Sequence, residues 1–227
     1  MKFESIGLLA FLIVPLAAAP GLAQTAPSQA EAAAYRDLFR AAQDGDAAAV
    51  SRLVAEGADI SARDGNGRTA AHVAAFASHE ETLAALAKAG ADMNALDDDA
   101  YDAVTIAAVA NDLPMLDAAL AAGNRPGNIT SRYIGTALIA AAHLGHHAVV
   151  KRLIEKGAPL DHVNNLGWTA LIEAVVLGDG GPNHQKTVAH LVAAGADRTI
   201  ADRDGATPLE LARQRGYGEI VTLLERP

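Results

Sequence analysis

Residues 64–75, DGNGRTAAHVAA, and residues 202–209, DRDGATPL, each contain turn-forming residues followed by a threonine that stands directly before apolar residues. Threonine caps helix N-termini well, because its side-chain oxygen can accept from the unpaired amides of the first turn. After Thr207, a proline at the first helical position and Glu210 complete a capping box. N-cap residue types recur at intervals of 33, 34, 33 and 38 residues, at Thr69, Asp102, Thr136, Thr169 and Thr207.

A second series consists of glycines that follow apolar helical segments. A glycine just past a helix can adopt the left-handed conformation that closes the last turn. The glycines are spaced by 33, 33, 34 and 38 residues, at Gly57, Gly90, Gly123, Gly157 and Gly195. Signals that start and end helices therefore alternate in one register along the chain.

The 21-residue blocks between cap and glycine each contain two apolar helical patterns, such as Ala70–Phe76 and Glu81–Ala89. A small or polar residue interrupts the blocks at Ser78, Asn111 and Gly145, which predicts a helix, a tight turn and an antiparallel helix. About 12 residues rich in turn formers connect the blocks, and we expect them to run out and back as a finger. One unit cannot bury both faces of its helix pair, so neighbouring units must stack.

Two insertions interrupt this register. One extra residue lies near Pro126 and Gly127, and five lie around residues 179–183. We expect the five to lengthen the loop between two helices. The Gly-rich string 178–182, GDGGP, lacks the lysine and hydroxyl of a phosphate-binding loop and follows a helix rather than a strand.

The repeated pattern resembles the ankyrin repeat, whose signature runs D-x-x-G-x-T-P-L-H-x-A-A and later G-A-D-x-N. The resemblance covers about residues 35–226 and implies an all-α ankyrin-repeat solenoid of about six helix-turn-helix units with β-hairpin-like fingers. The third repeat departs most, with Asp102 in place of threonine and residues 124–126, NRP, after its glycine. The expected repeats span about 34–63, 64–96, 97–130, 131–163, 164–201 and 202–227.

Residues 1–23 are typical of a secretory signal peptide. Lys2 precedes an apolar run over residues 6–19, and small residues at Gly21 and Ala23 fit a cleavage pocket. The run has 14 residues, short of the roughly 20 needed to span a bilayer. This length favours cleavage near Ala23 over retention as an anchor.

The mature chain would then begin with a flexible leader, residues 24–33, followed by one repeat domain, residues 34–227. Residues 167–171, GWTAL, and residues 178–182, GDGGP, resemble segments of exported bacterial ankyrin proteins. We therefore expect a periplasmic or secreted protein that has no membrane attachment after cleavage.

The composition agrees with helical packing and limits the classes of partner and site that we expect. The chain is 51% hydrophobic but only 4% aromatic, which favours Ala-rich seams over one core of large rings. Its formal charge of -9 and its scattered Lys and Arg residues argue against nucleic acid. The absence of cysteine excludes disulfides, thiolate metal sites and a cysteine nucleophile.

The ankyrin resemblance implies binding of a protein partner through finger tips and the inner surface of the first helices. Tyr101, Tyr133 and Trp168 are the foremost candidates, because aromatic anchors dominate interface energetics. The alternative is that each ring only covers its neighbouring finger. The implied partner-binding positions are Asn66, Arg68, Phe76, Asp99, Tyr101, Arg132, Tyr133, Asn165, Leu166 and Trp168. The resulting prediction is a monomeric, non-catalytic scaffold that binds another exported protein on its concave face.

Small-molecule or metal binding by the histidines of the fourth repeat is the alternative function. His143 and His147 are four residues apart, a spacing that puts side chains on one face of a helix, and His146 lies beside them. However, Gly145 is predicted at the turn and would separate His143 from His147. His72 matches the histidine of the ankyrin signature, and by resemblance it should hydrogen-bond to the finger.

No constellation in the sequence indicates catalysis or a cofactor. Asp97, Asp98, Asp99 and Asp102 are dense enough to attract calcium, but they lack the glycine and distal glutamate of a calcium loop, which favours a solvated finger tip. No nucleophile, base and orienting group fall together in any unit. We therefore expect no enzyme, no bound metal and no cofactor.

Overall fold

The computed structural model describes residues 24–226, so the predicted signal peptide of residues 1–23 lies outside the described part of the chain. Within that part the regular structure is helical, without a named strand and with one isolated β-bridge, between Thr130 and Gly135. No helix in residues 24–226 is long and apolar enough to cross a membrane. The helices are α1 (Gln29–Ala34), α2 (Asp37–Asp44), α3 (Ala47–Ala55), α4 (Ala70–Phe76), α5 (Glu80–Lys88), α6 (Ala103–Ala110), α7 (Leu113–Ala121), α8 (Ala137–His143), α9 (His147–Glu155), α10 (Ala170–Val176), α11 (Pro182–Ala193), α12 (Pro208–Gln214) and α13 (Gly218–Glu225).

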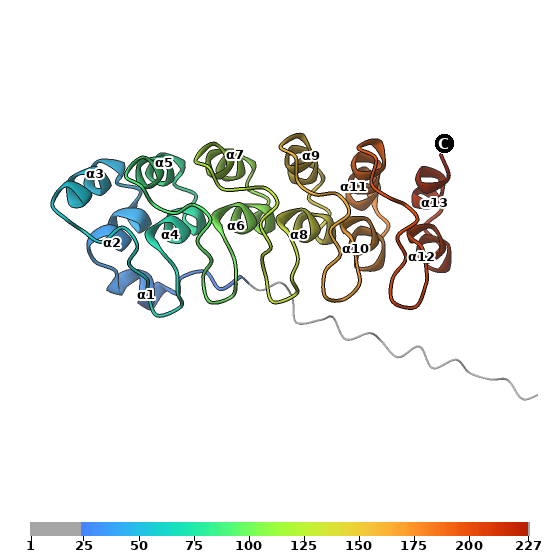
Figure 1. Ribbon diagram of the computed structural model, residues 1–227, viewed down its shortest axis with the longest axis horizontal. Coiled ribbons are helices and arrows are strands. Elements are labelled where there is room, and N and C mark those ends of the chain that lie inside the picture. Colours follow the sequence, from blue (N-terminus) through green and yellow to red (C-terminus); the bar gives the residue numbers. More distant parts are fainter. Residues whose placement is uncertain (1–23, 227) are drawn as a thin grey trace, which may run out of the picture.

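Helix pairs from α2–α3 to α12–α13 stand side by side in one elongated row (Figure 1). The first helices of the pairs form one layer and the second helices form another, and the connections between pairs project beyond the first helices as fingers (Figure 1). Each helix contacts its counterpart in the neighbouring pair, α4 against α6 and α5 against α7 for example. The predicted all-α solenoid of stacked helix-turn-helix units is confirmed.

The predicted start and stop signals act as expected. The cap side chains accept from the amide three residues further on at Asp102, Thr136, Thr169 and Thr207. The turns between paired helices have left-handed residues at the predicted breaks, Ser78 (φ 53°), Asn111 (φ 55°) and Gly145 (φ 68°). Local sequence chemistry therefore determines where each helix begins and ends.

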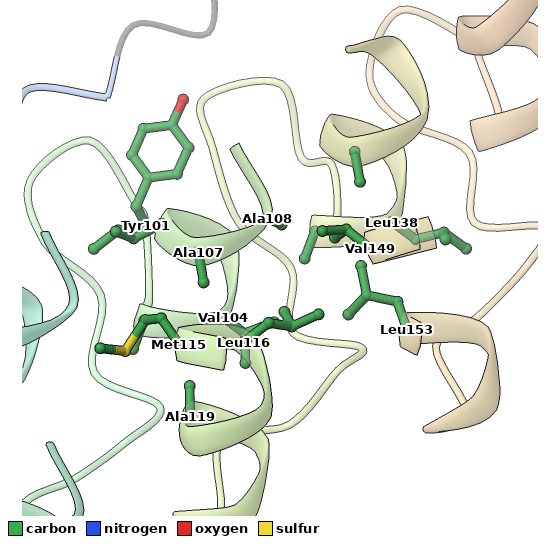
Figure 2. Packing of buried hydrophobic residues seen from close by; sticks show 14 of the residues in the cluster. Tyr101, Val104, Ala107, Ala108, Met115, Leu116, Ala119, Leu138, Val149 and Leu153 are labelled. Carbon is green, nitrogen blue, oxygen red and sulfur yellow. The ribbon is translucent and has the colours of Figure 1, made fainter. Parts of the chain in front are cut away.

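Small residues form the seam between the first helices, and larger aliphatic residues fill the space beneath. Alanines with no exposed surface recur at one repeat position, Ala74, Ala107, Ala141 and Ala174. Larger side chains with no exposed surface recur on the second helices, at Leu83, Leu116, Val150 and Val188. Figure 2 shows this packing between α6, α7, α8 and α9. Because alanine lets helices approach closely, the stack needs few aromatic rings.

A hydrogen bond between neighbouring pairs recurs at the turn before the second helix. The side chain at the N-cap of the second helix donates to a carbonyl near the end of the preceding pair's first helix, over 2.9–3.2 Å. These bonds join His79 to Gln43, His146 to Ala108, His184 to His143 and Tyr217 to Gly178. His184 lies inside α11, whose first turn is an addition to the repeat pattern.

That addition corrects one expectation. Helix α11 has 12 residues whereas α9 has nine, so the five-residue insertion does not only lengthen a loop but adds a helical turn that begins at Pro182. The remaining loop packs on the last helix pair, because a Cβ at Gly180 would lie 2.5 Å from the Tyr217 ring. The Gly-rich string is therefore explained by close packing.

The irregular third repeat contains a buried polar cluster around Asp102, which is 1% exposed. Its Oδ1 accepts from the amide and hydroxyl of Thr105 at 2.8 and 2.7 Å. Its Oδ2 accepts from the side-chain amides of Asn124 and Asn128 at 2.8 and 2.9 Å. Asn124 in turn accepts from the amide of Val104 at 2.8 Å. Asp102 and Asn124, which both depart from the repeat pattern, therefore depend on each other for their hydrogen bonds.

Replacing Asp102 by alanine should lower the free energy of unfolding by about 3 kcal/mol, because several buried donors lose their acceptor. Thr136→Ala is the matched control, since Thr136 caps α8 by accepting from one amide only, and it should cost about 1 kcal/mol. Urea unfolding followed by circular dichroism measures both losses. Equal losses in the two variants would contradict a cooperative cluster.

His72, in the second repeat, links α4 to the finger of the third repeat, as the resemblance implied. Its Nδ1 accepts from the amide of Thr69 at 3.0 Å, and its Nε2–H donates to the carbonyl of Tyr101 at 3.0 Å. The ring is therefore neutral, with its proton on Nε2. Burial lowers the pKa of His72 below 6.5, against the opposing influence of Asp97 and Asp102.

Because the pKa of His72 is lowered in the folded state, the contribution of His72 to the free energy of unfolding depends on pH. This contribution is complete above pH 6.5 and is lost as pH falls through the lowered pKa, because the unfolded state takes up the proton first. His72→Gln keeps a capping-box residue but does not titrate. We expect the wild-type unfolding free energy, relative to that of His72→Gln, to decline between about pH 7 and pH 5. Urea unfolding across that range measures it, and a constant difference would contradict the neutral ring.

Candidate functional site

Four of the five fingers are held by an Asp or Asn at the base that binds its own turn. Asp64 Oδ1 accepts from the amides of Asn66 and Arg68, both at 2.9 Å. The same pair of bonds, to the amides two and four residues on, is made by Asp97, Asn164 and Asp202. Such Asx turns fix the tip before any partner arrives.

Main-chain bonds also connect one finger to the next. The amides of Asp98, Ser131 and Asn165 donate to carbonyls of the preceding finger over 2.8–3.1 Å, at Asn66, Ala100 and Tyr133 respectively. The tips therefore form a continuous edge along the side of the stack on which they project (Figure 1). A surface built on these fingers keeps its shape when a partner binds.

The predicted partner-binding residues differ widely in exposure. Arg132 has the most exposed side chain, at 74%, and Asn165 and Leu166 are also exposed. Half-buried positions are Asn66, Phe76, Asp99, Tyr133 and Trp168. Arg68 and Tyr101 are buried, at 0% and 5% exposure. The exposed members therefore lie on the fourth and fifth fingers.

Tyr101 is consequently wrong as an exposed anchor. It stands directly before the cap Asp102, at the root of its finger, and its ring belongs to the buried apolar cluster. In Figure 2 the ring points away from Met115 and Leu116 of α7. Burial raises the pKa of the Tyr101 hydroxyl, with Asp99 adding to the effect. Trp168 occupies the equivalent position before Thr169 and is half-buried for the same reason.

Two finger residues that were not predicted also have exposed apolar side chains near these tips. Ile134 is 52% exposed and Val163 is 44% exposed, beside Leu166 at 36%. The His162 ring Nε2–H donates to the carbonyl of Ile134 at 2.6 Å and joins the two fingers. We call Tyr133, Ile134, Val163, Leu166 and Trp168 the finger patch.

Ile134 also has an unfavourable backbone. The residue two before the cap has positive φ in every finger, and it is glycine in three of them, with φ of 70° at Gly67, 86° at Gly167 and 81° at Gly205. Ile134 has φ 56° at this position. A β-branched residue is strained in the left-handed region. A signal in the sequence could have revealed Ile134, because an isoleucine stands at a position that glycine occupies in three other fingers.

The N-terminal residues do not form the predicted flexible leader. Helix α1 begins at a capping box between Ser28 and Glu31, and the segment crosses the second and third fingers on the inner side of the stack. The Gln24 side chain donates to the carbonyl of Thr105 in α6 at 2.9 Å, and the Thr25 hydroxyl donates to Asp99 at 3.3 Å. Sequence periodicity could not reveal this, because the contacts join residues 74 and 81 positions apart.

Arg68 is the centre of this contact and is buried beneath it. Its Nε donates to Asp64 at 2.7 Å, its Nη1 to the carbonyl of Thr25 at 2.9 Å and its Nη2 to Glu31 at 2.5 Å. The Asn66 side-chain amide donates to the same Glu31 oxygen at 2.5 Å. The Ser28 hydroxyl and amide, followed by Arg68, hold the pKa of Glu31 below its ordinary value.

The comparison with known proteins assigns the fold to a family. A family model described as ankyrin repeats in three copies matches residues 38–127 and 104–202. The chain belongs to the ankyrin-repeat family. A curated relative, the ankyrin repeat protein YahD of Escherichia coli (strain K12), is 38% identical over 190 residues, which cover 83% of this chain and 94% of YahD.

Solved ankyrin-repeat structures agree. An ankyrin repeat domain from Acinetobacter baumannii AYE is 43% identical, covers 82% of this chain and 95% of its own, and has a TM-score of 0.76. The ankyrin repeat protein EF0377 is 33% identical, covers 85% and 98%, and has a TM-score of 0.77. A chain in the complex of the Bdellovibrio bacteriovorus endopeptidase Bd0816 with immunity protein Bd3460 is 22% identical, covers 84% and 97%, and has a TM-score of 0.69, a likeness of fold alone.

In this ankyrin-repeat protein the three histidines of the fourth repeat do not converge. His143 lies 3.1 Å from Glu173, and His146 contacts the Ala108 carbonyl. His147 stacks on His190 with ring centroids 6.0 Å apart. Among residues 24–226 no group of three or more His, Cys, Asp or Glu side chains could hold a metal ion. The geometry therefore gives no support to the metal-binding alternative.

The acidic residues of the third finger are likewise dispersed. Asp97 binds its own turn, Asp99 pairs with Arg132 at 3.2 Å, and Asp102 is the buried cap.

A cavity between Tyr101 and Glu173 has a volume of only about 20 Å³, which is room for about one water molecule. It offers no place for a small-molecule ligand.

Removing the Glu31 carboxylate should release the N-terminal segment. Glu31→Gln weakens the bonds to Arg68 and Asn66, so we expect amide hydrogen exchange in residues 24–34 to accelerate at least tenfold. Glu210→Gln is the matched control, because Glu210 forms the equivalent capping box with Thr207 outside this contact. Hydrogen exchange read by mass spectrometry makes the comparison, and equal exchange in residues 24–34 of both variants would contradict the docking role of Glu31.

Proposed function

We propose that this protein is a non-catalytic scaffold that binds another protein, exported like itself, through the finger patch and the adjoining concave face. Ankyrin repeats generally mediate contacts between proteins. The fingers of the fourth and fifth repeats present apolar side chains on a hydrogen-bonded frame, together with the exposed guanidinium of Arg132. Apolar and arginine side chains are the groups that anchor interfaces.

Ile134 is the observation that carries this proposal. Its side chain is 52% exposed, so packing within the chain does not explain an isoleucine at a glycine position. The left-handed backbone costs the folded state about 1 kcal/mol or more. A strained residue with an exposed apolar side chain indicates a role in contacting another molecule.

Export to the periplasm or beyond is part of the proposal and is supported by the sequence of residues 1–23. The absence of cysteine suits an oxidising compartment, because no thiol can be oxidised there. Exposed polar residues at both ends of the stack, such as Arg36 and Glu219, support a monomer, since solenoid ends need polar outer faces.

Ile134→Gly should change stability and binding in opposite directions. Relief of the left-handed strain should raise the free energy of unfolding by about 1 kcal/mol. Loss of the exposed side chain should reduce capture of the partner from a periplasmic extract about tenfold. Quantitative pull-down with mass spectrometry and urea unfolding measure the two effects.

Ala100→Gly is the matched control for this experiment. Ala100 has φ 63° at the same repeat position but offers only a methyl group outside the finger patch. It should gain stability similarly and leave capture unchanged. If Ile134→Gly captures the partner as well as the wild type does, the assignment of the finger patch is wrong.

A further inference from the structure

The inner face beside the second and third fingers is already occupied, by residues 24–34 of the same chain. The hydrogen bonds between this segment and the repeats are of the kind that a groove forms with a bound peptide. Arg68 Nη1 binds a main-chain carbonyl at Thr25, and Arg68 Nη2 binds the carboxylate of Glu31. The side chain of Gln24 donates to the main chain of α6. The segment therefore covers part of the surface formed by the second and third fingers and α6.

The attachment of this segment is weak. Helix α1 has six residues and buries none of them, and a helix that short is unstable without tertiary support. Tyr35, which follows α1, is buried and its hydroxyl donates to Asp64 at 2.7 Å. Tyr35 therefore anchors the end of the segment, and among the side-chain hydrogen bonds of the first repeat, departure of residues 24–34 would break only those from Arg36 and Arg40 to the Ala33 carbonyl.

Departure of the segment would expose a carboxylate-binding group. Arg68 Nε keeps its bond to Asp64, which holds the guanidinium in place, while Nη1 and Nη2 lose both acceptors. A guanidinium with two free, oriented donors is suited to a carboxylate. The neighbouring Asn66 side-chain amide, which donates to Glu31, would become free at the same time.

We infer that the groove beneath residues 24–34 is a second peptide-binding site of this scaffold, with Arg68 as its carboxylate anchor, and that residues 24–34 are its built-in competitor. The occupant that would replace them is an extended segment of a partner protein that carries a carboxylate at the place of Glu31. The inference rests on the proposed function and adds the chemistry of the partner and a means of control.

A labelled peptide with the sequence of residues 24–34 tests the site directly. The tethered segment is present at an effective concentration of about 1 mM, so the free peptide competes poorly in the wild-type chain. Gln24→Ala with Glu31→Ala removes the side-chain contacts of Gln24 and Glu31, keeps the weaker contact of Thr25 with Asp99 and leaves the groove intact. We expect this double variant to bind the peptide at least tenfold more tightly than the wild type does, measured by fluorescence anisotropy up to about 2 mM protein.

Two groove variants on that background test the chemistry. Arg68→Gln should weaken peptide binding at least tenfold, and Asn66→Ala, which removes a half-buried side chain whose role is the bond to Glu31, should weaken it about threefold. A peptide with glutamine in place of its glutamate should bind at least fivefold more weakly. Glu210→Ala in the otherwise wild-type chain should bind the peptide as the wild type does. Equal peptide binding by wild type and double variant, or no binding by either, would overturn the inference.

The outcomes for the two proposals are separable. Ile134→Gly lies outside the groove and should leave peptide affinity unchanged. Loss of partner capture in Ile134→Gly, without peptide binding to the double variant, refutes the groove alone. Peptide binding that depends on Arg68, with partner capture unaffected by Ile134→Gly, refutes the finger patch alone.

Discussion

Each helix pair in this protein depends on the next pair to cover its apolar side. The helices are short, and their fully buried residues, such as Ala107 and Leu116, lie between neighbouring pairs. A single pair would leave half of this surface in water, which is why pairs stack into an elongated row. The alanine seam brings the first helices close together, and the bond that recurs at four of the second helices, from His146 to Ala108 for example, maintains the register.

The same stacking determines how the protein acts. It arranges the fingers along one edge (Figure 1). Because Asp64 and its equivalents fix four of the fingers, and main-chain bonds between Thr130 and Gly135 fix the fourth finger, side chains at the tips are positioned without further loss of conformational entropy. The surfaces that it presents are the apolar finger patch and the face that the N-terminal segment covers.

Two departures from the repeat pattern differ in kind, because one lies in the interior of the protein and the other lies on its surface. Asp102 and Asn124 break the pattern together, and their purpose is internal, since both are buried in one polar cluster. Ile134 also breaks the pattern, but its side chain faces solvent and its backbone is strained. The first kind of departure satisfies buried polar groups within the fold, and the second is not explained by packing within the chain.

The sequence alone determined the helix ends, the repeat register and the ankyrin family, because caps such as Thr207 and turns such as Gly145 act through bonds within a few residues. It also located the exposed tips Arg132 and Leu166. Only the tertiary structure decided that Arg68 and Tyr101 are buried and that residues 24–34 are docked. Those outcomes depend on which distant segment covers a side chain, and the bond from Gln24 to Thr105 spans 81 positions, which no local pattern encodes.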